Sequence, residues 1–249
     1  MRRHYGAPGM GEIRVGTSGW SYPTWVGPFY PQRTSPARML SVYAETFHTV
    51  EAHATHRRMP SAAGLAKWAA QAPDGFRFAP KAHVGITHRR DTDGLGDRVA
   101  AFFAVLEALG DRLGPVLFVL PHRQPDLDRL DLMLDALDRI VTRAQPVFEL
   151  APAWRVAAVL DRLVAHNASL AIVDREEDPA AEQPVVGPVT YVRLRREEYG
   201  DADLDEWAAR LRDAAGKDPE RDVYAFVKHD DEGHGPRYAR DLVGRLEQR

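Results

Sequence analysis

Short apolar runs alternate with amphipathic stretches along most of the chain. The runs are four to six residues long. One of them, residues 116–120, is apolar at every position, which is typical of a strand buried on both faces of a parallel sheet. We predict eight strands, at residues 13–16, 49–53, 76–79, 116–120, 146–150, 169–174, 190–194 and 222–227.

The stretches between these runs repeat apolar side chains every three or four residues, which predicts amphipathic helices. The first follows Ser35 and Pro36, a favourable cap and first-turn pair, and places Met39 and Tyr43 on one stripe. An irregular crossover is expected over residues 175–188, which are acidic, contain proline and show no helical stripe. Further stripes predict helices near residues 65–69, 99–109, 130–141, 154–166, 204–211 and 238–246.

Eight strands in 249 residues, each but the sixth followed by a predicted helix, indicate an α/β protein with a single-domain TIM-type (β/α)8 barrel. The rival is a doubly wound open sheet, which would have a glycine-rich phosphate turn after its first strand. Here Gly16-Thr17-Ser18-Gly19-Trp20 is too bulky and wrongly spaced for that turn. We expect an N-terminal extension over residues 1–12 and one barrel domain over residues 13–249.

Composition narrows the class of protein. There are 33 basic and 36 acidic residues, a net charge of −3, which excludes a general polyanion-coating protein but not a local cationic patch. The chain has no cysteine, which excludes a disulfide scaffold, a thiolate metal site and a cysteine nucleophile. Its apolar runs are far shorter than the roughly 20 residues that span a bilayer. With no apolar secretion signal at the start, we expect a cytoplasmic protein without membrane contact.

Ionisable side chains follow nearly every predicted strand. In a parallel barrel the carboxyl ends of the strands share one rim, and active sites lie there. Glu149 and Asp174 directly follow apolar segments. Glu51 and His53 point to one face because side chains alternate along a strand. Since an inward carboxylate is costly unless it is paired, we take these side chains as functional. The catalytic candidates are Glu51, Glu149, Asp174, Lys81 and His53.

Three chemistries are open to these residues. A divalent metal ion could be held by Glu51, His53, Glu149 and Asp174, although no compact ligand spacing supports it and pairing with basic residues competes. Two of the carboxylates could form an acid–base pair. Lys81 could form a Schiff base if its pKa were lowered, with a structural ion pair as the alternative. The chain shows no nucleotide or flavin cofactor motif.

Basic residues also gather where the predicted strands end. Planar guanidinium groups bind phosphate and carboxylate in a bidentate manner, so an anionic small-molecule substrate is expected; pairing with nearby acidic residues is the alternative. Aromatic side chains in the loop after the first strand could stack on a substrate or plug the barrel mouth. The substrate-binding candidates are Arg193, Lys228, His229, Asp230, Trp20, Tyr22, Arg57 and His88.

Two blocks of sequence resemble the domain-of-unknown-function-72 family, also called YecE-like. They are Val15-Gly16-Thr17-Ser18-Gly19-Trp20-Ser21-Tyr22 and Gly75-Phe76-Arg77-Phe78, and weaker similarity runs from residue 13 nearly to the end. The resemblance implies a TIM-type barrel related in shape to sugar isomerases and to the apurinic-site endonuclease barrels. It implies no established reaction.

The chain departs from the family pattern at the expected rim. The family usually has Glu-Ile-Asn after the second strand, where this chain has Glu51-Ala52-His53. The family's seventh-strand His-Gly is replaced by Arg195-Arg196, and its eighth-strand Asn-Asn-Asp by Lys228-His229-Asp230. These changes imply a divergent member with a different substrate, or one that has lost activity. The retained residues are Glu51, Lys81, Glu149, Asp174 and Arg193.

We therefore expect an enzyme of hydrolase or isomerase type that acts on a small polar, anionic substrate at the barrel rim. Carboxylates would supply acid–base or metal-ligand groups, and Lys81, Arg193 and Lys228 would bind the anion. One alternative is a protein that binds or processes nucleic acid, whose binding would weaken steeply with salt. Another is a non-catalytic, metabolite-binding barrel whose carboxylates are all tied up in ion pairs.

Overall fold

The computed structural model describes residues 11–89, 91–140 and 144–248. Within these residues the chain has the eight strands that the sequence predicts, at β1 Ile13–Thr17, β2 Thr49–Ala52, β3 Arg77–Pro80, β4 Val116–Val119, β5 Pro146–Glu149, β6 Ser169–Asp174, β7 Thr190–Leu194 and β8 Val223–Val227. The α-helices are α1 Pro36–Thr46, α2 Ala54–Arg57, α3 Ala62–Gln71, α4 Val84–Thr87, α5 Leu95–Leu106, α6 Leu127–Asp138, α7 Ala157–Ala165, α8 Asp201–Lys217 and α9 His234–Glu247. Short 3-10 helices lie at Pro23–Trp25, Glu107–Arg112, Pro152–Trp154 and Ala180–Glu182.

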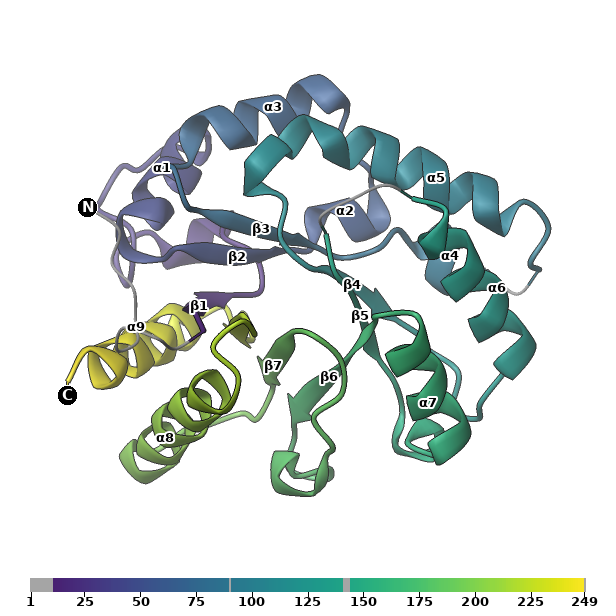
Figure 1. Ribbon diagram of the computed structural model, residues 1–249. Helices are drawn as coiled ribbons and strands as arrows, with labels where there is room; N and C mark the ends of the chain where they lie inside the picture. The colour runs from purple at the N-terminus through teal and green to yellow at the C-terminus, as the bar shows by residue number, and fades with distance from the viewer. Residues whose placement is uncertain (1–10, 90, 141–143, 249) are drawn as a thin grey trace.

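The strands are parallel and form two sheets. Six of those in the described residues pair in the order β1-β8-β7-β6-β5-β4, and β2 pairs with β3. Figure 1 shows the strands curling around the middle of the molecule, with the longer helices outside them. The α/β single domain is as predicted, but the larger ladder is a curled half-barrel rather than a continuous eight-stranded barrel. Only isolated bridges, such as Ser18–Glu51 and Lys81–Leu117, link the two sheets in the described residues.

Alternate residues of the strands face two separate cores. One set packs with the helices in the larger core and includes Phe118, Phe148 and Ile172. The other forms a smaller core that includes Leu117, Val147, Ala171 and Tyr191. Because neighbouring side chains point to opposite faces of a strand, the smaller core is the inner face of the curled sheets. Side chains in phase with it at the strand ends therefore point inward.

The junction between the sheets depends on a close approach of β1 and β2. A Cβ atom added to Gly16 would lie 2.1 Å from the carbonyl oxygen of Thr49. Glycine alone avoids that collision, so β1 can lie against β2 without a side chain between them.

Several element boundaries differ from those predicted. The helix expected from Trp154 begins at Ala157, because Trp154 is buried in a preceding 3-10 turn and its indole donates to the carbonyl of His122 at 2.7 Å. The crossover after β6 holds only the Ala180–Glu182 turn among described residues, as expected. Most of the predicted N-terminal extension, residues 1–10, and the predicted helix end at 141 lie outside the described residues. Among the described helices, none is long and apolar enough to cross a membrane.

Candidate functional site

Four of the predicted residues meet where the strands end. Lys81 follows Ala79 by two residues, Glu149 follows Val147, and Arg193 follows Tyr191, so all three side chains point to the inner face. Glu51 joins them from β2 and is fully buried. Side chains separated by more than 140 positions thus form one cluster, as the barrel geometry predicted.

Glu51 is the most densely bonded carboxylate of this cluster. Its two oxygens accept hydrogen bonds from the Ser18 hydroxyl at 2.9 Å and the Tyr191 hydroxyl at 2.8 Å. Arg193 donates from Nε at 2.8 Å and from Nη2 at 2.7 Å, and Arg195 donates at 2.8 Å. The imidazole of His53 also contacts it. This carboxylate is therefore held in place from several elements.

Arg193 joins Glu51 to the second inward carboxylate. Its Nη1 donates to Glu149, which also accepts from Arg175 at 2.7 Å. Arg193 and Glu149 are both buried, so this is a buried carboxylate–guanidinium–carboxylate chain. A guanidinium stays protonated, and its fork of donors suits two carboxylates at once.

The pKa values of both carboxylates are low. Burial alone would raise the pKa of Glu51, but the Arg193 and Arg195 guanidinium groups hold it well below the usual value. Burial likewise opposes the ionised form of Glu149, and Arg193, Arg195 and Arg175 together lower the pKa of Glu149. Both groups are ionised at neutral pH, which suits them to orienting neighbours better than to donating protons.

His53 and Glu51 form a carboxylate–imidazole pair. The carboxylate can only accept, so we assign the proton to His53 Nε2; Arg193 Nη2, 3.5 Å from that nitrogen, is too distant to compete. Burial lowers the pKa of His53, although Glu51 acts in the opposite direction. The imidazole is thus neutral at pH 7. Its Nδ1 makes no hydrogen bond within the described chain and carries a free lone pair.

Lys81 is the cation of the cluster that lacks a direct partner. Its amine forms no hydrogen bond or ion pair with the residues that the structure describes. Burial lowers the pKa of Lys81 and the nearby Arg193 adds to this, while Glu51 and Glu149 act in the opposite direction. A partly buried amine of lowered pKa is suited to proton transfer or to pairing with an anionic ligand.

The predicted aromatic candidates divide into one core residue and one rim residue. Trp20 is buried in the larger, helix-facing core, with its ring centre 4.8 Å from that of Trp68 on α3, so it neither faces a ligand nor plugs the barrel mouth. Tyr22 stacks on His229 at 4.8 Å, and His229 lies 6.0 Å from His53 between ring centres. Tyr22 and His229 therefore border the Glu51–His53 pair.

Asp174 is not brought together with Glu51 and Glu149. It is in phase with Ile172, so its side chain leaves β6 on the helix-facing side. There its Oδ2 accepts from Arg196 Nε at 2.8 Å, Tyr199 Oη at 3.0 Å and Trp207 Nε1 at 3.2 Å. These hydrogen bonds hold the β7–α8 connection against the end of β6.

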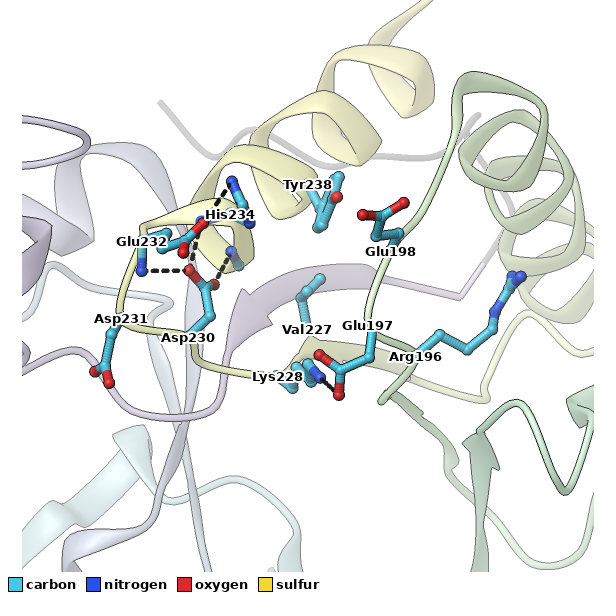
Figure 2. A pocket seen from close by; sticks show the side chains of 11 residues that line it. Arg196, Glu197, Glu198, Val227, Lys228, Asp230, Asp231, Glu232, His234 and Tyr238 are labelled. Atoms are coloured by element: carbon cyan, nitrogen blue, oxygen red, sulfur yellow. Dashed lines mark hydrogen bonds and ion pairs between the residues drawn. The ribbon is translucent and has the colours of Figure 1, made fainter.

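Two predicted substrate-binding residues line a separate cavity of 320 Å³ between the segments that follow β7 and β8 (Figure 2). Lys228 pairs with Glu197 at 2.6 Å. Asp230 accepts from the backbone N–H groups of Glu232 and His234 at 2.8 Å and also bonds Gly235. Asp230 thus caps the first turn of α9, and the charge of Lys228 is balanced by Glu197.

The last two substrate-binding candidates, Arg57 and His88, follow β2 and β3 in the chain. Arg57 is exposed on α2. His88 is partly buried, with its Nδ1 2.8 Å from the Thr87 hydroxyl and its ring 5.2 Å from that of His56. Burial and the neighbouring Lys81 lower the pKa of His88, so it too is neutral at pH 7.

The proposed metal ligands do not form a common ligand set. Glu51 and Glu149 both bind Arg193, His53 binds Glu51, and Asp174 lies on the opposite face of β6. Among described residues, no group of three or more histidines or carboxylates is arranged to hold a metal ion.

Four residues that bond the two inward carboxylates were not among the site candidates: Ser18, Arg175, Tyr191 and Arg195. Arg195 is in phase with Arg193, so strand alternation could have identified it as inward-facing. In the sequence, Tyr191 looks like any other apolar residue of a strand. Arg175 lies in the segment predicted to be irregular. For these two, no sequence signal separates a site residue from a structural one.

Comparison with known proteins agrees with this architecture. A family model described as "Protein of unknown function DUF72" matches residues 14–249. The UPF0759 protein YunF of Bacillus subtilis (strain 168) is 29% identical over 115 residues, which cover 44% of this chain and 40% of that protein. A solved DUF72 family structure from Enterococcus faecalis V583 has a TM-score of 0.77 at 17% identity, covering 95% of this chain and 96% of that one. Another, from Thermotoga maritima MSB8, has a TM-score of 0.72 at 20% identity, covering 95% and 99%. The chain therefore belongs to the DUF72 family.

Proposed function

We propose that this protein is an enzyme that transfers protons on a small polar, anionic substrate at the carboxyl ends of its strands. The observation that carries the proposal is the pairing of His53 with the buried Glu51, which leaves Nδ1 of a neutral imidazole unbonded. A carboxylate that fixes the tautomer and orientation of a histidine is the arrangement used by general bases. Isomerisation and hydrolysis both fit this group.

The remaining residues take supporting roles in this proposal. Glu51 positions His53, and Glu149 holds Arg193. Lys81 supplies a positive charge, or a second proton, beside them. Asp174, Lys228 and Asp230 have structural roles, because each is already bonded within another part of the fold. A small substrate is favoured over nucleic acid because Arg193, Arg195 and Arg196 are directed toward carboxylates of the protein.

We further propose that the eight strands close into one (β/α)8 barrel in the working enzyme. The isolated bridges Ser18–Glu51, Phe78–Leu113 and Lys81–Leu117 support closure at both junctions of the two sheets. Closure would place the strand ends around one mouth, where substrates of such barrels bind.

A proton-exchange assay tests the proposed activity. The protein is incubated in D2O with a panel of sugar phosphates and hydroxy acids, and deuterium uptake and product release are followed by NMR. We expect exchange or turnover that falls about 100-fold or more in His53→Gln, since positioned general bases contribute roughly that much.

His166→Gln is the matched control. His166 is also bonded to a carboxylate, that of Asp138 at 2.7 Å, but at the end of α7 away from the cluster. Its substitution should leave activity intact. The proposal is overturned if the panel shows no exchange or turnover, or if a folded His53→Gln variant keeps wild-type activity.

A further inference from the structure

The 320 Å³ cavity between the segments that follow β7 and β8 is separate from the inward-facing cluster (Figure 2). Val227, which lines it, is in phase with Ala225 and packs in the helix-facing core. The cavity therefore lies on the helix side of β8, whereas Glu51 and Glu149 lie on the inner face of the sheets. Its volume is at the lower end of the range for small-molecule sites.

Acidic side chains dominate the lining of this cavity. The lining includes the cations Arg196 and Lys228 and the carboxylates of Glu197, Glu198, Asp230, Asp231 and Glu232. Arg196 donates to Asp174 at 2.8 Å and to Asp203 at 3.1 Å, neither of which lines the cavity. Lys228 pairs with Glu197 at 2.6 Å. The lining therefore carries negative charge that its own cations do not balance.

The unbalanced charge is on both walls of the cavity. Asp230 is satisfied by backbone N–H groups of α9. Glu232 pairs with the imidazole of His234 at 3.6 Å, and no lysine or arginine of the described chain pairs with it. The carboxylate of Glu198 forms no hydrogen bond or ion pair within the described chain. Figure 2 shows Glu198 on the wall beyond β7 and Glu232 on the opposite wall, in the turn before α9.

Tyr238 presents an unbonded hydroxyl at the same cavity. It lines the cavity from α9 and is only 8% exposed, yet its hydroxyl forms no hydrogen bond with the residues that the structure describes. Its ring packs against Tyr199, with 5.8 Å between ring centres, and the Arg237 guanidinium lies 4.9 Å from its ring centre. Figure 2 shows the hydroxyl on the side of Glu198.

The other buried tyrosines of the described chain do not share this feature. Each of their hydroxyl groups takes part in a hydrogen bond; they are Tyr30, Tyr43, Tyr191, Tyr199 and Tyr224. Leaving a buried hydroxyl without a partner is unfavourable. The hydroxyl of Tyr238 is therefore expected to have a partner that the described chain does not supply.

We propose that this cavity binds a small organic cation, a linear diamine whose two ammonium groups pair with Glu198 and Glu232. The first ammonium would donate to the Glu198 carboxylate and to the Tyr238 hydroxyl, since an ammonium has three donors and a phenol can accept. A metal ion does not fit, because the described carboxylates and histidines form no group arranged to hold one. The inference does not depend on the proposed activity, because the cavity is separate from the Glu51–His53 pair.

Putrescine is the probe that tests this site, and butanediol, which has the same chain length without the charge, is its comparison. Binding of each to the full chain is measured by calorimetry at constant ionic strength. We expect saturable binding of putrescine and none of butanediol. Glu198→Gln should weaken putrescine binding about tenfold, the loss typical of a charged hydrogen bond. Tyr238→Phe removes only the hydroxyl and should weaken binding about threefold.

Glu220→Gln is the matched control. Glu220 is exposed just before β8, at the opposite end of that strand from the cavity. Its substitution removes the same charge as Glu198→Gln without touching the lining, so putrescine binding should be unchanged. If Tyr238→Phe does not fold, Glu198→Gln carries the test, because Glu198 is exposed and its side chain is not bonded within the described chain.

The proposal is overturned if putrescine does not bind the wild type saturably, or if the folded Glu198→Gln and Tyr238→Phe variants bind it as the wild type does. Equal binding of butanediol would reject a site that selects for positive charge. Displacement of putrescine by magnesium chloride at the same ionic strength would assign the carboxylates to a metal ion instead. His53→Gln should leave putrescine binding intact, and its loss in that variant would place the ligand at the inward-facing cluster.

Discussion

Arg193 connects the two inward carboxylates of this protein, and its surroundings show how one side chain can organise a site. Burial lowers the pKa of an arginine, yet the Glu149 and Glu51 carboxylates raise the pKa of Arg193 above its usual value. The same ion pairs keep both carboxylates charged. Removing any member leaves an uncompensated charge in the interior, so the three residues act as a unit.

Glu51→Gln should therefore destabilise the protein strongly. The variant keeps the shape of the side chain but leaves the Arg193 and Arg195 guanidinium groups without a buried counter-charge. We expect the free energy of unfolding to fall by about 3–5 kcal/mol in urea denaturation. Glu197→Gln removes an 85% exposed partner of Lys228 and should change it by less than about 1 kcal/mol. Equal effects in the two variants would contradict the buried chain.

Neutral histidines at the rim should make stability depend on pH. Burial lowers the pKa of His56 to about 4, and Lys81, His88 and His53 add to this, although the Ala82 carbonyl that it bonds acts in the opposite direction. The unfolded value is about 6.5. The unfolded chain therefore binds the proton more readily than the folded one. The stability contributed by the neutral imidazole is complete above about pH 6.5 and is lost as the pH falls toward about 4.

His56→Gln should reduce this pH dependence. Urea unfolding of the wild type and the variant at about pH 7, 6 and 5 measures it through the change in unfolding free energy. We expect the wild type to lose more stability than His56→Gln over that interval. Parallel curves for the two proteins would show that His56 does not bind its proton more weakly when folded.

At the scale of strands and helices, the sequence predicts which elements form better than which way their side chains point. β6 coincides with its predicted residues, 169–174. Its residues are apolar on both faces, because one face packs in the inner core and the other against helices. Without alternation of polar and apolar residues, the sequence does not indicate that Asp174 faces outward. The structure brings Glu51, Glu149, Lys81 and Arg193 together because each leaves its strand on the inner face.

Arg129 is a buried charged residue on a helix that the sequence pattern did not single out. Arg129 lies at the position of an apolar stripe on α6, four residues before Met133 and seven before Ala136. A charged residue within such a stripe is a signal that a helical-periodicity reading could have used. Its meaning still depends on Ile86, whose carbonyl accepts a hydrogen bond from Arg129 at 2.7 Å and which no local pattern brings to it.

Substitution of Asp230 should destabilise the first turn of α9, which it caps. It accepts hydrogen bonds from N–H groups in the first turn of α9, so Asp230→Ala leaves them unsatisfied. We expect a loss of about 0.5–2 kcal/mol in unfolding free energy and unchanged turnover of the substrate panel. Asp231→Ala, at an exposed neighbour, should stay within about 0.5 kcal/mol of the wild type. Loss of turnover in a folded Asp230→Ala variant would return this residue to the substrate site.

For the molecule as a whole, strand pairing is sparsest where the two sheets meet. β6 and β7 share a continuous register over Ala171–Asp174, whereas β3 and β4 are joined only by isolated bridges in the described chain. Lys81, which follows β3, borders this same junction. Binding of an anionic substrate at Lys81 and closure of the sheets are therefore expected to be coupled.

Hydrogen–deuterium exchange tests that coupling. Across the β3–β4 junction, the amides of Ala82 and Gly114 donate to the carbonyls of Leu117 and Phe78 at 2.8 Å. We expect these amides to exchange faster than those of β7 in the free protein, because few bonds support them. A saturating substrate from the panel should slow their exchange and leave β7 unchanged. Uniform protection of the strands without ligand would contradict a weak junction.

The carboxylate of Asp230 also bears on how a ligand would be oriented. Many (β/α)8 enzymes seat a substrate phosphate beyond strands seven and eight, at the start of a helix. In this protein that position is filled by the chain's own negative group, with Glu197 and Glu198 lining the same cavity. A phosphorylated compound would be repelled there. In the proposed function it would have to enter turned end for end, with its charged tail toward Lys81 and its reactive head beside His53.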